Sequence, residues 1–147
     1  MSGSTAKWSW RWPRPADFII GGAENPYIYR WWVIPRNTWF NIYLHKIVRD
    51  DDDRALHDHP WVNLSIILKG CYYEVTPRGR KLRRSWVPIL RMPKAAHRLE
   101  LPDGHCWSLF ITGPRVREWG FLCPKGWVHW KIFTDPTDSA RVGRGCD

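Results

Sequence analysis

Hydrophobic residues gather in short runs along the chain, and each run is bounded by Pro, Gly or Asp. Residues 26–35 (PYIYRWWVIP) and 38–48 (TWFNIYLHKIV) are typical, because both are rich in aromatic and β-branched residues and only an Arg-Asn pair separates them. Runs of this composition and length favour β-strands. We therefore predict eight or nine strands with no helical period between them. The further runs are 61–68, 71–76, 85–90, 97–101, 106–113, 118–123 and 127–133.

Strands at this spacing indicate an all-β domain, either a sandwich or a closed barrel of the jelly-roll kind. A Lys-Gly pair ending in Gly70 separates two of the runs and predicts a hairpin, because glycine adopts a positive φ easily. We expect one domain over 17–134, a flexible Trp/Arg/Pro-rich tail over 1–16 and a C-terminal tail over 135–147. The total of 147 residues suits a single core of this kind.

Composition adds aromatic bulk and positive charge to this picture. The chain has 12 Trp, 5 Tyr and 5 Phe, so we expect large rings to build the core and the walls of any pocket. Its formal net charge of +9 could attract nucleic acid, an anionic surface or a small acidic molecule. No nucleic-acid-binding motif accompanies the charge, which favours a small-molecule ligand over nucleic acid. We expect the densest basic run, 78–84, at the solvated tip of a hairpin.

The cysteines show neither a CxxC pair nor any other metal-site spacing. We expect four free thiols in a reducing cytoplasm. No apolar run approaches the roughly 20 residues of a membrane helix, and the start of the chain builds no signal-like apolar run, so we expect no membrane partner. The four residues are Cys71, Cys106, Cys123 and Cys146.

The stretch LHDHPW holds the strongest candidate for chemistry. His57 and His59 stand two residues apart, so on an extended strand their rings leave the same face and can converge on one ion. Imidazole binds Zn, Fe, Ni or Cu through a neutral nitrogen, and two histidines still need further ligands. His97, in PKAAHR, is the best candidate for the third. The sequence predicts a divalent metal site on these three histidines.

The same residues resemble a known family. His57-x-His59, followed by Asn63 and then Gly70, is similar to the first motif of the cupins, and residues 93–97 are similar to a shortened second motif. The segments RALHDHPW, ILKGCYYE, AAHRLEL, FITGPRVREWGF and GWVHW resemble, more narrowly, a group of small bacterial and phage-borne cupin-like proteins. This resemblance covers roughly residues 18 to 133. It implies a cupin-type double-stranded β-helix, a jelly-roll barrel in one domain.

The chain departs from the cupin pattern at one position that matters for the metal. The first motif usually supplies a Glu ligand where this chain has Asn63. The resemblance therefore implies a three-histidine centre, or one completed by another residue. Candidates for a fourth ligand or a neighbouring partner are Asn63, Glu74, Glu118 and His45, and candidates for binding a substrate are Tyr43, Arg115 and Arg117.

Two functions of different class follow from these observations. The first is a non-haem metal-dependent enzyme, dioxygenase-like and oxygen-using, that acts on a small polar molecule. Its metal is expected to be Fe, with Zn, Ni or Mn as alternatives. The second is a non-catalytic cupin module that binds a small ligand and that a phage could encode. The sequence does not identify catalytic residues, and a homodimer is a further expectation because cupin barrels commonly pair.

Overall fold

The computed structural model describes residues 12–51, 55–102 and 104–147. Within them the chain forms twelve strands and one helical turn, so the all-β prediction is confirmed. In chain order the elements are β1 (Phe18–Ile20), β2 (Ile28–Trp32), β3 (Asn41–Ile47), β4 (Leu56–His57), β5 (Asn63–Lys69), β6 (Tyr72–Thr76), β7 (Gly79–Arg83), β8 (Ile89–Arg91), β9 (Arg98–Glu100), β10 (Cys106–Thr112), β11 (Gly120–Cys123), β12 (Gly126–His129) and α1 (Trp130–Phe133).

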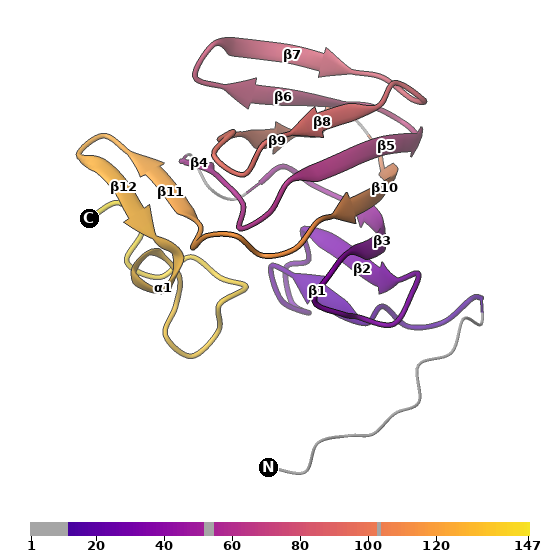
Figure 1. Cartoon of the computed structure of the whole chain (residues 1–147), viewed down its shortest axis with the longest axis horizontal. Helices are drawn as coiled ribbons and strands as arrows, with labels where there is room; N and C mark the ends of the chain where they lie inside the picture. The colour runs from indigo at the N-terminus through magenta and orange to yellow at the C-terminus, as the bar shows by residue number, and fades with distance from the viewer. Residues whose placement is uncertain (1–11, 52–54, 103) are drawn as a thin grey trace.

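The strands form one large sheet and two small ones, all antiparallel (Figure 1). The large sheet has the order β1-β2-β3-β10-β5-β8, and the small sheets have the orders β12-β11-β4 and β7-β6-β9. An isolated antiparallel bridge between His57 and His97 joins the two small sheets, because His57 ends β4 and His97 directly precedes β9. The small sheets together therefore make a second wall opposite the large sheet.

Strands β3, β5 and β10 alternate buried and partly buried residues along their length, as expected when one face of a sheet points inward. Their inward faces are unusually polar and include His45, Asn63, Ser65, Ser108 and Thr112. Buried polar groups need hydrogen-bond partners, so this interior is organised around polar contacts as well as apolar packing. An apolar cluster lies beside them and consists of Tyr27, Ile28, Ile47, Ile67, Tyr72, Ile89, Leu99 and Cys106.

The predicted Lys-Gly hairpin is wrong. Strands β5 and β6, on either side of it, belong to different sheets and do not pair with each other. Gly70 has a φ of +86° as expected, but a Cβ there would lie 2.6 Å from the carbonyl oxygen of His105. A glycine is needed because the chain crosses from one sheet to the other in close contact with a neighbouring loop.

The basic run begins at the exposed turn of a hairpin, as predicted, but it continues beyond the tip as a strand. Residues 79–83 are strand β7 and pair with β6 along its whole length. Arg80 donates to Glu100 at 2.7 Å, and Arg83 donates to Glu74 at 2.6 Å. The run escaped prediction as a strand because its stabilising carboxylates lie on other strands. Similarly, the predicted strand over 127–133 ends at His129 and continues as helix α1.

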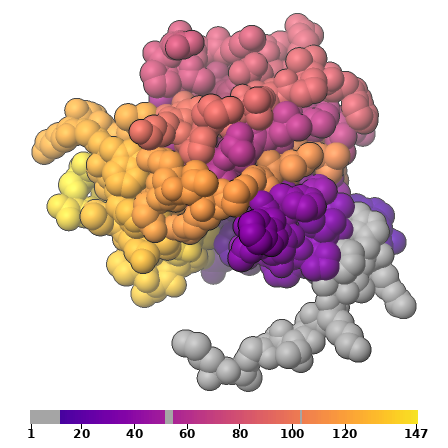
Figure 2. Space-filling model, in the orientation of Figure 1, coloured from indigo at the N-terminus to yellow at the C-terminus, as the bar shows by residue number. Residues whose placement is uncertain are grey.

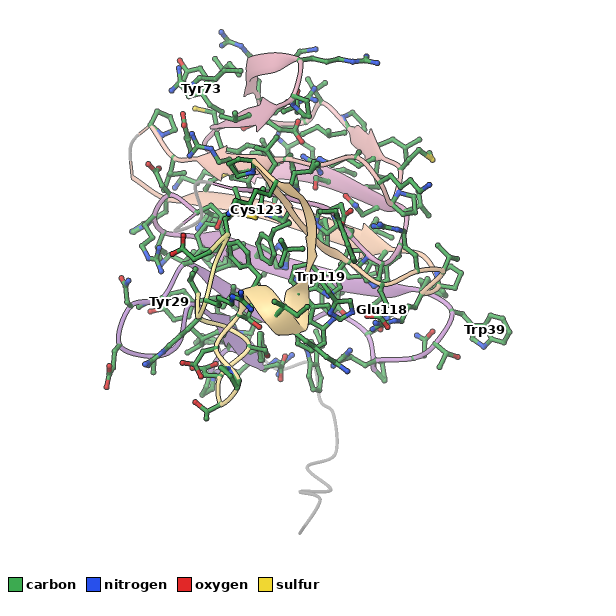
Figure 3. The ribbon with its side chains drawn as sticks, turned by 90° about the vertical axis from the view of Figure 1, so that its left-hand side faces the viewer. Tyr29, Trp39, Tyr73, Glu118, Trp119 and Cys123 are labelled. Carbon is green, nitrogen blue, oxygen red and sulfur yellow. A yellow bond between two sulfur atoms is a disulfide. The ribbon has the colours of Figure 1, made fainter. Side chains whose placement is uncertain are left out.

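Large rings fill much of the interior, but some of them lie outside it. Trp39 projects from the body of the molecule (Figure 3) and is 75% exposed. Trp86 is 70% exposed. The expectation that aromatic residues build the core therefore holds only in part.

Residues 135–147, for which the sequence predicts a tail, lie against the end of the domain (Figure 2). Backbone hydrogen bonds from this segment reach the carbonyl oxygen of Phe133, and Thr134 forms a bridge with Val142. A disulfide between Cys123 and Cys146 joins the segment to β11. Its sulfurs adjoin an apolar cluster made of Ala55, Phe121, Cys123 and Phe133.

The prediction of four free thiols is thus wrong for Cys123 and Cys146, whereas Cys71 and Cys106 are free. A separation of 23 residues carries no pairing signal in the sequence. Among the described residues, none of the helices is long and apolar enough to cross a membrane.

Replacing Cys146 by Ser is expected to lower the free energy of unfolding by about 3 kcal/mol, because the disulfide restricts the unfolded chain over a loop of this size. Chemical denaturation without reductant measures the effect. Cys71→Ser, which removes a free thiol, is the control and is expected to change the stability much less. Equal unfolding midpoints for Cys146→Ser and the parent protein would contradict the assignment of the disulfide.

Candidate metal centre

Three histidine rings converge at one end of the interior. One ring nitrogen of each of His57, His59 and His97 lies within 4.8 Å of those of the other two. Their ring centroids are 4.9 to 5.2 Å apart. The structure thus brings together the three residues that the sequence singled out, and their arrangement could hold one metal ion.

Backbone hydrogen bonds position the rings. The N–H of His57 donates to the carbonyl of His97 at 2.9 Å, and the N–H of His97 donates back at 3.0 Å. Two residues that exchange both bonds across an antiparallel pair present their side chains on the same face. The N–H of His59 donates to the carbonyl of Pro93 at 3.0 Å, which places the third ring beside the first two. Strand pairing therefore brings His97 next to His57 and His59, although the two segments lie far apart in the sequence.

Asp58 lies between His57 and His59, and its side chain points away from theirs. It is buried, and its carboxylate accepts from the backbone N–H of Gly120 at 2.8 Å and from the indole of Trp127 at 3.0 Å. Arg117 completes the set at 2.8 Å from the same carboxylate. A Cβ on Gly120 would lie 2.1 Å from the carbonyl oxygen of Val128, so only glycine permits this approach of β12. Asp58 thereby anchors the segment from His57 to His59, which we call the metal motif, to β11 and β12.

Glu74 lies behind the histidines. Its side chain is 2% exposed and accepts from His97 Nδ1 at 2.8 Å, from Arg91 Nε at 2.5 Å and from Arg83 Nε at 2.6 Å. Burial alone would raise the pKa of Glu74, but the hydrogen bonds from His97 and Arg91, with the charge of Arg91, hold it well below its usual range. Glu74 is therefore a carboxylate that orients His97, and its contacts do not place it among the metal-ligating atoms.

Arg91 has partners for all of its nitrogens. Besides Glu74, it donates to Ser65 Oγ at 2.8 Å, to Asn63 Oδ1 at 3.3 Å and to Tyr72 Oη at 3.1 Å. Asn63 is 1% exposed, and its Nδ2 has no hydrogen-bond partner within the described residues. The residue that stands in place of the expected Glu ligand thus contacts the buried arginine through its oxygen.

His59 and His97 are held in the neutral form, which is the form that ligates a metal. Burial lowers the pKa of His97 to about 3, with the charge of Arg91 acting in the same direction and the hydrogen bond to Glu74 opposing both. Burial also holds the pKa of His59 well below its ordinary value, with the neighbouring histidines contributing. The Nδ1 atom of His59 is sealed from solvent without a hydrogen bond within the described part of the chain. An orphaned ring nitrogen beside two further imidazoles fits a bound cation.

A cavity of about 430 Å³ opens in front of the three histidines. Its walls include Trp61, whose ring stacks on His59 at 5.3 Å, and Phe110, 6.1 Å from the same ring. His45 lines the other side of the cavity, where its Nε2 accepts from Arg30 Nε at 2.9 Å. Burial and the charge of Arg30 lower the pKa of His45 well below its ordinary value, so His45 is neutral. The cavity is large enough for a small organic molecule.

The other candidates from the sequence lie in different places. Glu118 is exposed beside helix α1 (Figure 3), where it pairs with Arg115 and His129 at 2.9 Å each. Arg117 supports the metal motif through Asp58, and it is not among the residues that line the cavity. Arg115 does line the cavity, but Glu118 offsets its charge.

Tyr43 is buried, and the guanidinium of Arg30 lies 4.4 Å above its ring. It also does not line the cavity. Tyr43 therefore contacts the Arg30 cation through its ring and does not contribute to the cavity wall. His45 lies across Phe110 from the histidine group and is not one of the three clustered rings.

Sequence reasoning missed Asp58, Arg91 and Arg30. Asp58 carried a signal, because its neighbours point to one face and it therefore points to the other. Arg91 and Arg30 had no such signal in the sequence, because each lies on a strand whose register and partners depend on contacts with residues far away in the chain.

The free energy of unfolding of the metal-free protein is expected to fall as the pH drops below 6.5. His45 keeps its proton off in the fold but binds one when unfolded, so each such group favours the unfolded state in acid by about 1.4 kcal/mol per pH unit. His45→Gln retains an acceptor for Arg30. Between pH 5 and 6 it should reduce the pH dependence of the unfolding free energy by about 1.4 kcal/mol per pH unit, the contribution of one proton. Urea denaturation at several pH values measures it, with His105→Gln, on an exposed loop, as control. An unaltered slope in His45→Gln would argue against a neutral His45.

No protein-family model matches the chain, and no curated protein matches it. Solved structures do. KdgF from a Halomonas species aligns with a TM-score of 0.53 and 13% identity, over 62% of this chain and 83% of that one. Fe(II)-HppE with an alternative substrate aligns with a TM-score of 0.51 and 12% identity, over 64% of this chain and 54% of that one.

A cupin-2 domain protein from Shewanella frigidimarina aligns with a TM-score of 0.49 and 14% identity, over 58% of this chain and 79% of that one. At these identities the comparison concerns the fold. The antiparallel strands, their arrangement in facing sheets and the alignments with KdgF and HppE agree with one another. The chain therefore has the fold of the cupin superfamily, a jelly-roll barrel in a single domain.

Proposed function

We propose that this cupin is a metal-dependent enzyme that binds one divalent ion through His57, His59 and His97 and converts a small polar molecule in the adjoining cavity. The convergence of three ring nitrogens within 4.8 Å carries the proposal. Iron is the proposed metal, with Zn, Ni or Mn as alternatives, and oxygen is the proposed co-substrate.

The surroundings of the rings support a metal over a purely structural cluster. Metal-ligating histidines generally donate their second ring N–H to a carboxylate or a carbonyl. His97 does so to Glu74, and His57 Nδ1 lies 3.3 Å from the carboxylate of Asp51. Each contact leaves Nε2 of its ring for an ion. Three neutral ligands leave the ion with its full positive charge and with open positions for other molecules.

The solved structures favour iron only by analogy. HppE, one of the structures with the same fold, is described with Fe(II) and an alternative substrate. At 12% identity its metal and its substrate are its own. A three-imidazole set suits iron, nickel, copper and zinc alike, so the donor types do not separate these metals.

A bound ion would supply Lewis acidity and a place where oxygen and substrate meet. The chain's own residues orient the three histidines and surround them with apolar side chains. Trp61 and Phe110 lie 5.3 and 6.1 Å from the His59 ring, and Phe121 lies 6.1 Å from the His57 ring, so the site has apolar walls beside two of its histidines. Asp58 and Glu74 hold the motif and His97 in place from behind.

Protein purified without chelator is expected to contain about one divalent ion per chain, whereas His57→Ala and His97→Ala should lose it. Elemental analysis measures both. His129→Ala is the matched control, because His129 pairs with Glu118 on the surface and is expected to leave the metal content unchanged. Parent protein that takes up no stoichiometric metal, even when reconstituted with Fe(II), would sink the proposal. Oxygen uptake by the loaded protein with small-molecule libraries then separates an enzyme from a non-catalytic ligand-binding module.

Glu74→Gln is expected to weaken metal binding by about 10- to 100-fold, because an amide no longer accepts the full set of donors and His97 loses its orientation. It should also lower the free energy of unfolding by about 3–5 kcal/mol, since the buried Arg91 loses its counter-charge. Metal titration and denaturation measure the two effects. Glu100→Gln, which weakens two less buried ion pairs on the neighbouring strand, should cost no more than about 1 kcal/mol and spare the metal. Equal metal affinity in Glu74→Gln and Glu100→Gln would refute this role of Glu74.

A further inference from the structure

We propose that the cavity takes a substrate bearing a carboxylate, that Arg30 binds this carboxylate, and that the remainder of the same molecule reaches the three histidines. The last step rests on the proposed function. The Arg30 subsite itself does not, because it is built on strands β2 and β3 of the large sheet, away from the metal motif.

The charged groups around the cavity favour an anion. Five arginines and one acidic residue, Asp51, line it within the described residues. Asp51 lies against His57, and the lining contains none of the other described carboxylates. A cavity lined by charges of one sign attracts ligands of the opposite sign. The arginines are Arg30, Arg36, Arg91, Arg115 and Arg141.

Carboxylates of the protein already offset three of these five charges. Arg91 pairs with Glu74, Arg115 with Glu118, and Arg141 with Asp138. Arg36 is exposed and lies over the ring of Trp32. Arg30 is left as the inward-facing guanidinium that has no carboxylate partner among the residues described.

Arg30 is held in a fixed orientation by neutral neighbours. Its Nε donates to His45 Nε2 at 2.9 Å, and its guanidinium lies 4.4 Å above the Tyr43 ring. Burial lowers the pKa of Arg30 to about 10, which still leaves it charged at neutral pH. Its two terminal nitrogens have no hydrogen bond within the described part of the chain and are not among its sealed polar atoms. That outer edge of a guanidinium matches the two oxygens of a carboxylate.

The subsite and the histidines face each other across Phe110. The Phe110 ring lies 5.1 Å from His45, which holds Arg30, and 6.1 Å from His59. Arg30 and His45 are register partners across β2 and β3, so their side chains share the inner face of the large sheet. A molecule with a few carbon atoms between its carboxylate and a metal-binding group is long enough to occupy both places.

Protein loaded with Co(II) and a matched pair of thiols tests the inference. The probes are 3-mercaptopropionate and 3-mercaptopropan-1-ol, with the two-carbon pair mercaptoacetate and 2-mercaptoethanol as a length series. Their thiolates can ligate cobalt and give a charge-transfer absorption, so binding is measured without any turnover. We expect at least one acid to bind tenfold or more tightly than its alcohol.

Variants assign the preference to its residue. Arg30→Met replaces the guanidinium by an uncharged chain and should bring the acid and the alcohol within twofold, with cobalt content and alcohol affinity unchanged. Arg30→Lys keeps a charge and should retain part of the preference, which guards against a variant that fails to fold. Arg115→Met removes another lining arginine, whose charge Glu118 offsets, and should keep the full preference.

The outcomes separate the two proposals. Equal binding of acids and alcohols by the parent protein, or a preference that survives Arg30→Met, overturns the Arg30 subsite. A preference abolished by Arg115→Met alone does the same. Failure to take up cobalt overturns the metal centre, and calorimetric titration of the same thiols into metal-free protein then decides the subsite by the same comparison of acid with alcohol.

Discussion

The pair of backbone hydrogen bonds between His57 and His97 is the constraint on which the rest of the site depends. It joins the sheet of β4, β11 and β12 to the sheet of β6, β7 and β9, so that the two histidines connect both halves of one wall of the barrel. The same pairing directs both rings to one face. A change that separates these strands would therefore dismantle the metal motif and the wall together, and the fold and the candidate site cannot vary independently.

The polar interior follows from this arrangement. With histidines inside one wall, the barrel needs a partner for the second nitrogen of His97, and residues of β5, β6 and β8 supply that partner and its counter-charge. Glu74 accepts from His97, Arg91 balances Glu74, and Ser65 with Asn63 accepts from Arg91. Glu74 and Arg91 thus balance each other's charge, and each donor from the His97 ring to the Arg91 guanidinium has an acceptor, which is the condition under which burial of such groups is tolerated.

Alternation was enough to predict the all-β class, and the spacing of His57 and His59 was enough to predict their shared face, because both depend on neighbours within a few residues. The cupin fold and the motif that contains His97 came from the resemblance to a known family. What failed depended on pairing between distant strands. Glu74 looked like a ligand because a carboxylate on a strand after Gly70 gives no sign of which arginine faces it. Arg83 lies on β7, which pairs with β6, and Arg91 lies on β8 of the large sheet, so strand pairing and the packing of the two walls decide that. The Cys123–Cys146 pair and the strand formed by the basic run were hidden for the same reason: their partners lie far along the chain.

The exchange of the expected Glu ligand for Asn63 also has a physical consequence for ligand choice. A carboxylate at position 63 would stand beside Arg91 and compete with Glu74 for it, since Arg91 already donates to both positions. With Asn63 in place, the nearby negative charge is that of Glu74, which contacts His97 Nδ1 and does not line the cavity. One side of the cavity then presents three imidazoles, and across Phe110 stands the guanidinium of Arg30, which has no carboxylate partner among the described residues. An ion on the three histidines would add a second positive charge to that of Arg30, so a single anionic molecule that bridges the two is the ligand that the proposed site would favour.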